Sequence, residues 1–280
     1  MKKISKIVAG VVLAGMTILF CAGASAEEVQ VQGKKVRGFL YFAQPIEKVE
    51  EYFVQSSGNI PLYFDDLNSL LLALQAKKVD SALRFPQPVA EYICNHNQKM
   101  QVVLPPYEKY RGNLFLRMGT MPNNTKVAEL LNSAIKELQV NGKLDALQKK
   151  YVDECLQKGK EPKAVTLPKF KDAQVIKVAV TGDNPPIDLV AADGTPAGFN
   201  VAMLAEIAKL KKVNIIPIPM NSGARFISLT KGIVDAIFFI DEAVFSDAKI
   251  TEFNAETDLP KNICVTDAYA KYPIRYVVRK

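Results

Sequence analysis

Side chains suited to binding an anion stand near the ends of two predicted elements. Ser222 and Arg225 lie at the start of a helix predicted to open at Ser222-Gly223, with Ser222 as its N-cap. The free amides of a first helical turn, a hydroxyl and a guanidinium together favour a carboxylate or a phosphate. Arg84 follows a predicted buried strand and offers a second cation. The alternatives are that Arg225 is a solvated helix arginine and that Arg84 pairs with an acid such as Glu91.

The other candidate ligand contacts lie in loops at the carboxyl ends of predicted strands, where doubly wound α/β folds bind their ligands. Asp241 and Glu242 either offer carboxylates to a ligand amine or are solvated. Phe239 either packs against an apolar ligand or belongs to the core. The predicted ligand-binding residues are Asp183, Asn184, Ser222, Arg225, Phe239, Asp241, Glu242, Phe42, Gln44, Arg84 and Phe85. No catalytic residue is predicted.

Hydrophobic periodicity predicts two βαβαβ units, which makes the fold class α/β. In the later unit, Asn200 is the predicted N-cap of the first helix and Gly232 stops the second helix. The predicted strands of the two units are 33–41, 60–64, 79–83, 176–180, 214–219 and 234–240. Segment 74–82 matches segment 229–237 in its spacing of leucine, valine and aspartate. This match predicts an internal pseudo-repeat; the alternative is two generic helix–turn–strand units.

Segment 178–235 resembles the first lobe of amino-acid-type extracellular solute-binding proteins (family 3), the receptors of ABC importers. It has the family's proline-containing loop, the Asp193-Gly194 turn, the helix start Gly198-Phe199-Asn200 and a G-x-x-D-A strand at Gly232 to Ala236. Segment 111–156 resembles the family's usual ending, in which a helix, here expected at 125–140, is followed by Asn-Gly-Lys and a terminal helix. The resemblance implies a type II periplasmic binding protein fold, with two doubly wound lobes joined by a hinge and a ligand cleft between them.

The order of these segments differs from the usual family order and implies a circular permutation. The alternative is two fragments of a broken tandem. Permutation is physically tolerable because the termini of domains lie at the surface and often close together. The predicted parts are a signal peptide at 1–26, lobe two at 27–110, the closing part of lobe one at 111–156, a linker at 157–174, and the opening part of lobe one with a hinge strand at 175–280.

The resemblance fails where family members clamp an amino acid. They usually follow the G-x-x-D-A strand with small hydroxyl residues and a Thr-x-x-Arg segment, whose arginine binds the ligand α-carboxylate. Here the run is 238–242, and that arginine is missing. Phe85 stands where the family often places an aspartate for the ligand amine. Two interpretations stay open: Arg225 replaces the clamp and Asp241 or Glu242 contacts an amine, or the ligand is not an α-amino acid.

Residues 1–26 have the pattern of a secretory signal peptide. A lysine-rich start precedes an apolar run at 7–21, and Ala24-Ser25-Ala26 supplies small residues for cleavage after Ala26. We therefore expect a periplasmic or cell-envelope location; a membrane-spanning helix is the alternative. Phe20 before Cys21 argues against a lipid anchor, because lipoprotein signals have a small residue there.

Composition argues against several other classes of protein. The formal net charge is +7, and no basic stripe alternates with aromatic residues, so nucleic acid is not an expected partner. With a single histidine, His96, and no CxxC motif, we expect neither a metal nor another cofactor. Cys94, Cys155 and Cys264 can form at most one disulfide within the chain.

The predicted function is non-enzymatic capture of a small, carboxylated solute, an amino acid or a derivative, by closure of two lobes. The predicted partners are this ligand and the membrane subunits of an ABC importer, and the protein is expected to be a monomer. One alternative is a periplasmic enzyme similar to cyclohexadienyl dehydratase, with Asp241 and Glu242 as its acid–base candidates. The other is an accessory protein that senses the ligand.

Overall fold

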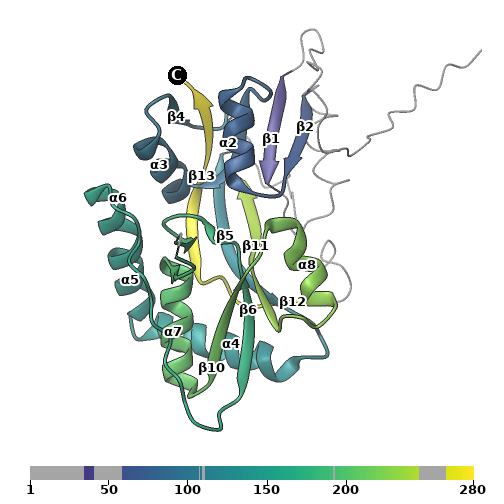
Figure 1. Ribbon diagram of the computed structural model, residues 1–280, viewed down its shortest axis with the longest axis vertical. Helices are drawn as coiled ribbons and strands as arrows, with labels where there is room; N and C mark the ends of the chain where they lie inside the picture. The colour runs from purple at the N-terminus through teal and green to yellow at the C-terminus, as the bar shows by residue number, and fades with distance from the viewer. Residues whose placement is uncertain (1–34, 41–58, 107, 109–110, 192, 246–262) are drawn as a thin grey trace, which may run out of the picture. The chain divides into compact units, whose positions relative to one another are not determined.

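The computed structural model describes residues 35–40, 59–106, 108, 111–191, 193–245 and 263–280. Ten strands of these residues form one sheet, with eight of them in the order β10-β6-β11-β5-β13-β3-β1-β2 (Figure 1). The bounds are β1 Val36–Leu40, β2 Ile60–Phe64, β3 Ser81–Pro86, β4 Met100–Val103, β5 Gly112–Thr120, β6 Val175–Val180, β10 Asn214–Pro219, β11 Ala236–Phe245, β12 Cys264–Val265 and β13 Ala270–Arg279.

Each end of this strand order repeats one arrangement. Strands β2, β1 and β3 are parallel to one another, as are β10, β6 and β11, and an antiparallel strand follows each set, β13 in the first and β5 in the second. Parallel neighbours need crossover connections. Helix α2 (Leu67–Gln75) supplies one for the first set, and α7 (Phe199–Lys211) and α8 (Ser222–Thr230) supply two for the second. The predicted α/β class is therefore confirmed.

Strand β13 belongs to both sets. Its first part, Ala270 to Pro273, pairs with β5, whereas Ile274 to Arg279 pairs with β3 and β4. Figure 1 shows β13, in yellow, passing from one group of strands to the other. A strand shared in this way is the element that the sequence predicts as a hinge strand.

Helices with buried apolar faces accompany the sheet. Helix α4 (Thr125–Val140) has the predicted bounds and buries Leu131 and Ile135, while α7 is buried along most of its length. The remaining elements are α3 Gln87–His96, α5 Lys143–Gln148, the π-helix η3 Lys149–Asp153, α6 Glu154–Lys158, and a small sheet of β7 Asp183–Asn184, β8 Asp188–Val190 and β9 Pro196–Ala197. Within the described residues, no helix is long and apolar enough to cross a membrane.

The predicted pseudo-repeat is confirmed and is longer than the sequence match. A shift of 155 in residue number carries both ends of α2 onto the ends of α8, since Leu67 becomes Ser222 and Gln75 becomes Thr230. The N-cap side chains also correspond: Asp66 accepts from the amide of Ser69 at 2.8 Å and Asn221 from that of Ala224 at 2.9 Å. We call 59–86 the first repeat and 214–241 the second repeat.

The shared aspartates have the same structural role in the two repeats. The Asp80 carboxylate accepts from the backbone amide of Val36 at 2.7 Å, and the Asp235 carboxylate accepts from that of Lys177 at 2.8 Å. In return, the amides of Asp80 and Asp235 donate to the carbonyl oxygens of Val36 and Lys177. Each aspartate thus fastens the turn after its helix to the first strand of its unit.

Two predicted N-caps are wrong. Asn221, not Ser222, caps α8, and Ser222 is the first helical residue. Gly198, not Asn200, caps α7, with a φ of 95° that favours glycine. A Cβ at Gly198 would lie 2.8 Å from the carbonyl oxygen of Ile187, so the chain needs glycine at this close approach.

Candidate functional site

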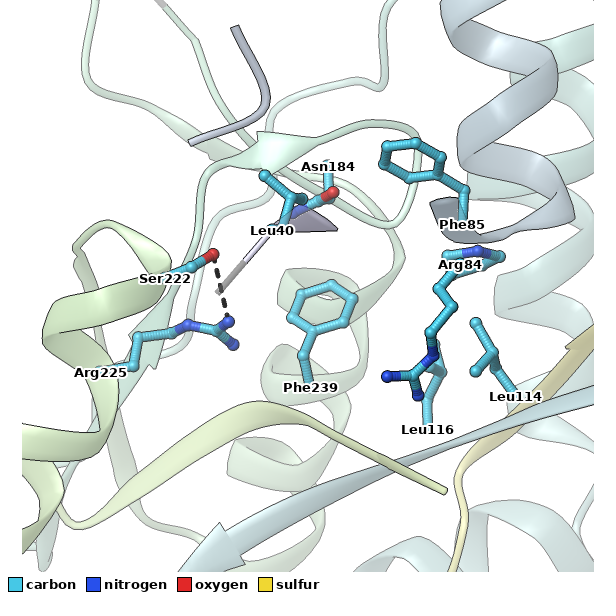
Figure 2. A pocket seen from close by; sticks show the side chains of 10 residues that line it. Leu40, Arg84, Phe85, Leu114, Leu116, Asn184, Ser222, Arg225 and Phe239 are labelled. Carbon is cyan, nitrogen blue, oxygen red and sulfur yellow. Dashed lines mark hydrogen bonds between the residues drawn. The ribbon is translucent and has the colours of Figure 1, made fainter. Parts of the chain in front are cut away.

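A small cavity lies where the two repeats meet, and side chains from both line it (Figure 2). Its volume is about 20 Å³, which is room for about one water molecule. Six of the predicted ligand-binding residues line it: Asn184, Ser222, Arg225, Phe239, Arg84 and Phe85. The structure therefore brings together residues that are up to 155 positions apart in the sequence, although their contact with a ligand stays a prediction.

Arg225 reaches the cavity from α8 and is only 4% exposed. Its Nη1 donates to the carbonyl oxygen of Phe238 at 2.6 Å, and its Nη2 donates to the Ser222 hydroxyl at 3.3 Å. The guanidinium carbon lies 5.4 Å from the centre of the Phe239 ring, within the range of a cation–π contact. The interpretation of Arg225 as a solvated helix arginine is wrong.

Arg84 and Phe239 occupy the same position in the two repeats and share an unusual backbone conformation. Their φ angles are 63° and 61°, in the left-handed region that residues other than glycine seldom adopt. Both side chains are buried, Arg84 at 1% exposure, and both line the cavity. A residue in such a conformation costs free energy and persists only where the surrounding structure holds it. Residues of this kind cluster at functional sites.

Asp183 lies beside the cavity, outside both repeats, and binds the first repeat. Its Oδ2 accepts the backbone amide of Leu67, the first residue of α2, at 2.8 Å. Its Oδ1 accepts from the side-chain amide of Asn184 at 3.0 Å. Burial raises the pKa of Asp183, while the bond from Leu67 and the charge of Arg225 act in the opposite direction. The carboxylate thus binds a helix N-terminus that carries a partial positive charge.

A contact between the two repeats involves the residue of α8 that corresponds to Leu67. The backbone amide of Ser222 donates to the carbonyl oxygen of Asp65 at 3.0 Å. Next to it, a Cβ added to Gly223 would lie 2.6 Å from Asp65 Oδ1, so this approach has no room for a side chain. The first amides of α2 and α8 therefore both donate to groups beyond their own repeat.

Sequence reasoning missed Asp188, a fully buried acid near the cavity. Its carboxylate accepts from the backbone amides of Thr181 at 3.3 Å and Gly182 at 3.0 Å, and from the side chain of Asn200 at 3.4 Å. Burial raises the pKa of Asp188 to about 6. Its position between apolar Ile187 and Leu189 was the available signal, since an acid within an apolar run has to find partners.

The other predicted residues are less completely placed. The backbone of Asp241 pairs with Leu116 in β11 and β5, and that of Glu242 pairs with Phe115. Phe42 and Gln44 lie outside the described residues. The sequence analysis also did not name four lining residues, which are Leu40, Pro86, Leu114 and Leu116.

No metal or disulfide site is present in the part of the chain that the structure describes. It contains no cluster of three or more His, Cys, Asp or Glu side chains able to hold a metal ion. Cys94, Cys155 and Cys264 are all unbonded there. The polar groups that line the cavity are two arginine side chains, the Ser222 hydroxyl and the Asn184 amide, and its other walls are apolar.

The segment that supplies most of the second repeat's side of the cavity also carries the family signature. Residues 176–242 match the family model of the bacterial extracellular solute-binding proteins, family 3. This segment is similar to the family 3 solute-binding proteins. No curated protein matches the chain by sequence.

Several solved structures are similar to this chain. The ligand-binding component of an ABC-type import system from Staphylococcus aureus, with zinc bound, shares 10% identity at a TM-score of 0.42, over 89% of this chain and 66% of that one. The GluR0 ligand-binding core from Nostoc punctiforme, in complex with L-glutamate, shares 10% identity at a TM-score of 0.36, over 88% of this chain and 85% of that one. Arginine-bound ArgBP from T. maritima shares 12% identity at a TM-score of 0.36, over 89% of this chain and 88% of that one. All three TM-scores are below 0.5.

Proposed function

We propose that the protein captures a small carboxylated solute, an amino acid or a derivative, and delivers it to an ABC importer without changing it chemically. In this proposal the chain is exported, loses residues 1–26 after Ala26, and works as a monomer in the periplasm or cell envelope. The domain boundaries predicted from the sequence, with two lobes permuted around the linker 157–174, belong to the same proposal.

The observation that carries the proposal is the buried pair of Arg225 and Ser222 at a cavity between the repeats. A guanidinium stays charged under all ordinary conditions, and burying it is costly unless an anion or several acceptors compensate. It also fits a carboxylate with two parallel hydrogen bonds. An anionic solute bound in the cavity would add to the acceptors that compensate the buried charge of Arg225.

The size of the cavity supports binding by closure. A volume of about 20 Å³ is too small for an amino acid, so the walls must separate for a solute to enter. The contacts of Asp183 with Leu67 and of Ser222 with Asp65 join the walls when they approach. A solute that touches both walls then favours the closed state through its higher affinity for that state.

The proposal is tested by a thermal-shift screen of the mature protein against amino acids, short peptides, polyamines and organic acids, followed by calorimetric titration of the hits. Arg225→Gln should weaken binding of a carboxylate hit by about 1.5–3 kcal/mol, because a charge-assisted hydrogen bond is lost. Lys231→Gln is the matched control, since it removes an exposed cation just after the same helix. Equal affinity of Arg225→Gln and wild-type protein would exclude Arg225 as the anion contact.

A dehydratase is the second candidate. Asp188, whose pKa is raised to about 6, is the described acid best tuned for proton transfer, but it does not line the cavity. We therefore propose binding and not turnover. Formation of a new product from a cyclic di-acid by the purified protein would reverse this choice.

A further inference from the structure

We propose that the solute is a short dicarboxylate, bound at one end by Arg225 and Ser222 and at the other by Arg84. This inference rests on the proposed function, because it names the class of carboxylate that the same cavity takes. It assigns Arg84 as the residue that selects two anionic groups over one.

Two buried arginines line one cavity, and they come from different repeats. Arg84 is 1% exposed at the end of β3, and Arg225 is 4% exposed in α8. Figure 2 shows their guanidinium groups on either side of the Phe239 ring. A guanidinium can bind protein groups and a ligand anion together because it has five N–H donors. A molecule that spans this cavity therefore meets a cation at each end.

The pseudo-repeat shows that neither arginine is required by the architecture. The position of Arg225 in the first repeat is Leu70, which is fully buried in the core, and the position of Arg84 in the second repeat is Phe239. The same backbone thus accommodates an apolar side chain at both positions. A buried charge placed where the fold accepts a hydrophobic residue is expected at a functional site.

The cavity must widen from about 20 Å³ to hold such a solute, and its remaining walls suit a short apolar spacer with an anion at each end. Among the described lining residues none is acidic, and the walls are largely Leu40, Leu114, Leu116, Phe85 and Phe239. The nearby carboxylates of Asp183 and Asp188 accept backbone amides and do not line the cavity. Two cations with apolar walls between them match a dicarboxylate better than a monocarboxylate of equal length.

Calorimetric titration with glutarate and pentanoate tests the inference, because the two have the same chain length and differ by one carboxylate. We expect wild-type protein to bind glutarate about 10- to 100-fold more tightly than pentanoate. Arg84→Gln should weaken glutarate binding far more than pentanoate binding and so remove most of this preference, while Arg84→Lys should keep part of it. Lys78→Gln, which removes an exposed cation of the same repeat, should behave as wild-type protein.

The outcomes separate the inference from the function on which it rests. Equal affinity for glutarate and pentanoate, or tighter binding of an amino acid with one carboxylate such as alanine, would overturn the dicarboxylate and leave solute binding intact. Equal weakening of both acids by Arg84→Gln would give Arg84 only a structural role. If no carboxylate of the screen binds, the proposed function fails and the inference fails with it. Thermal unfolding of each variant confirms that it is folded before titration.

Discussion

At the scale of the residue, Asp188 should make stability depend on pH. Its pKa in the folded protein is about 6, above the value of about 3.9 expected for an unfolded chain. Between these values the folded state holds more protons, so the free energy of unfolding should fall as pH rises, by about 2–3 kcal/mol in total from this group. Urea unfolding of wild-type protein and Asp188→Asn at about pH 4 and pH 7 measures this change. The fall should be smaller in the variant, where Asp183 with its raised pKa still contributes to it.

Asp193→Asn is the control, because Asp193 should change stability with pH in the direction opposite to that of Asp188. Asp193 is exposed, and hydrogen bonds from Thr195 lower its pKa, so its contribution to stability should appear as pH rises. If Asp188→Asn and wild-type protein show the same dependence on pH, Asp188 does not carry the raised pKa.

At the scale of the element, the first turns of α2 and α8 control how closely the repeats approach. Gly223→Ala adds a Cβ that would lie 2.6 Å from Asp65 Oδ1, so one side of the contact must move. Alanine is also the better helix former, by about 1 kcal/mol. We therefore expect unchanged or higher thermal stability together with about fivefold weaker binding of a carboxylate that binds wild-type protein.

The double variant Gly223→Ala with Asp65→Ala should recover the affinity, because the clash is removed. Calorimetric titration and thermal unfolding of wild-type protein and the two variants give the affinity and the stability. Undiminished affinity in Gly223→Ala would mean that this contact does not limit closure.

At the scale of the whole molecule, the strand register supports the proposed permutation. Arg37 of β1 and Val278 of β13 both lie beside Ser81 of β3, so they are two strand spacings apart, about 10 Å. A short Gly-Ser segment can join Lys280 to Lys35 at this distance.

A chain that begins at Glu161, continues through this junction and ends at Lys160 should fold and bind as the natural order does, because the contacts are the same and only the connections change. Circular dichroism, the unfolding midpoint and calorimetric titration compare the two. A chain opened instead at Met203, inside α7, should lose stability. Failure of both permuted chains would argue against permutation.

The sequence by itself determined the main elements. Strands β2 and β10 and helix α4 begin and end at the predicted residues, because periodicity, caps and turn residues act between neighbours in the chain. The rule that ligands bind at the carboxyl ends of strands also led to Arg84 and Arg225, which do line one cavity.

The tertiary structure alone decided how these elements meet. The bond from the Leu67 amide to Asp183 joins residues 116 positions apart, and the burial of Asp188 depends on the packing of Asn200 and the loop at Gly182. The match of Arg225 to Leu70 likewise becomes visible only when the two repeats are compared as folded units. Such features arise from contacts between distant segments, and no local pattern of residue types encodes them.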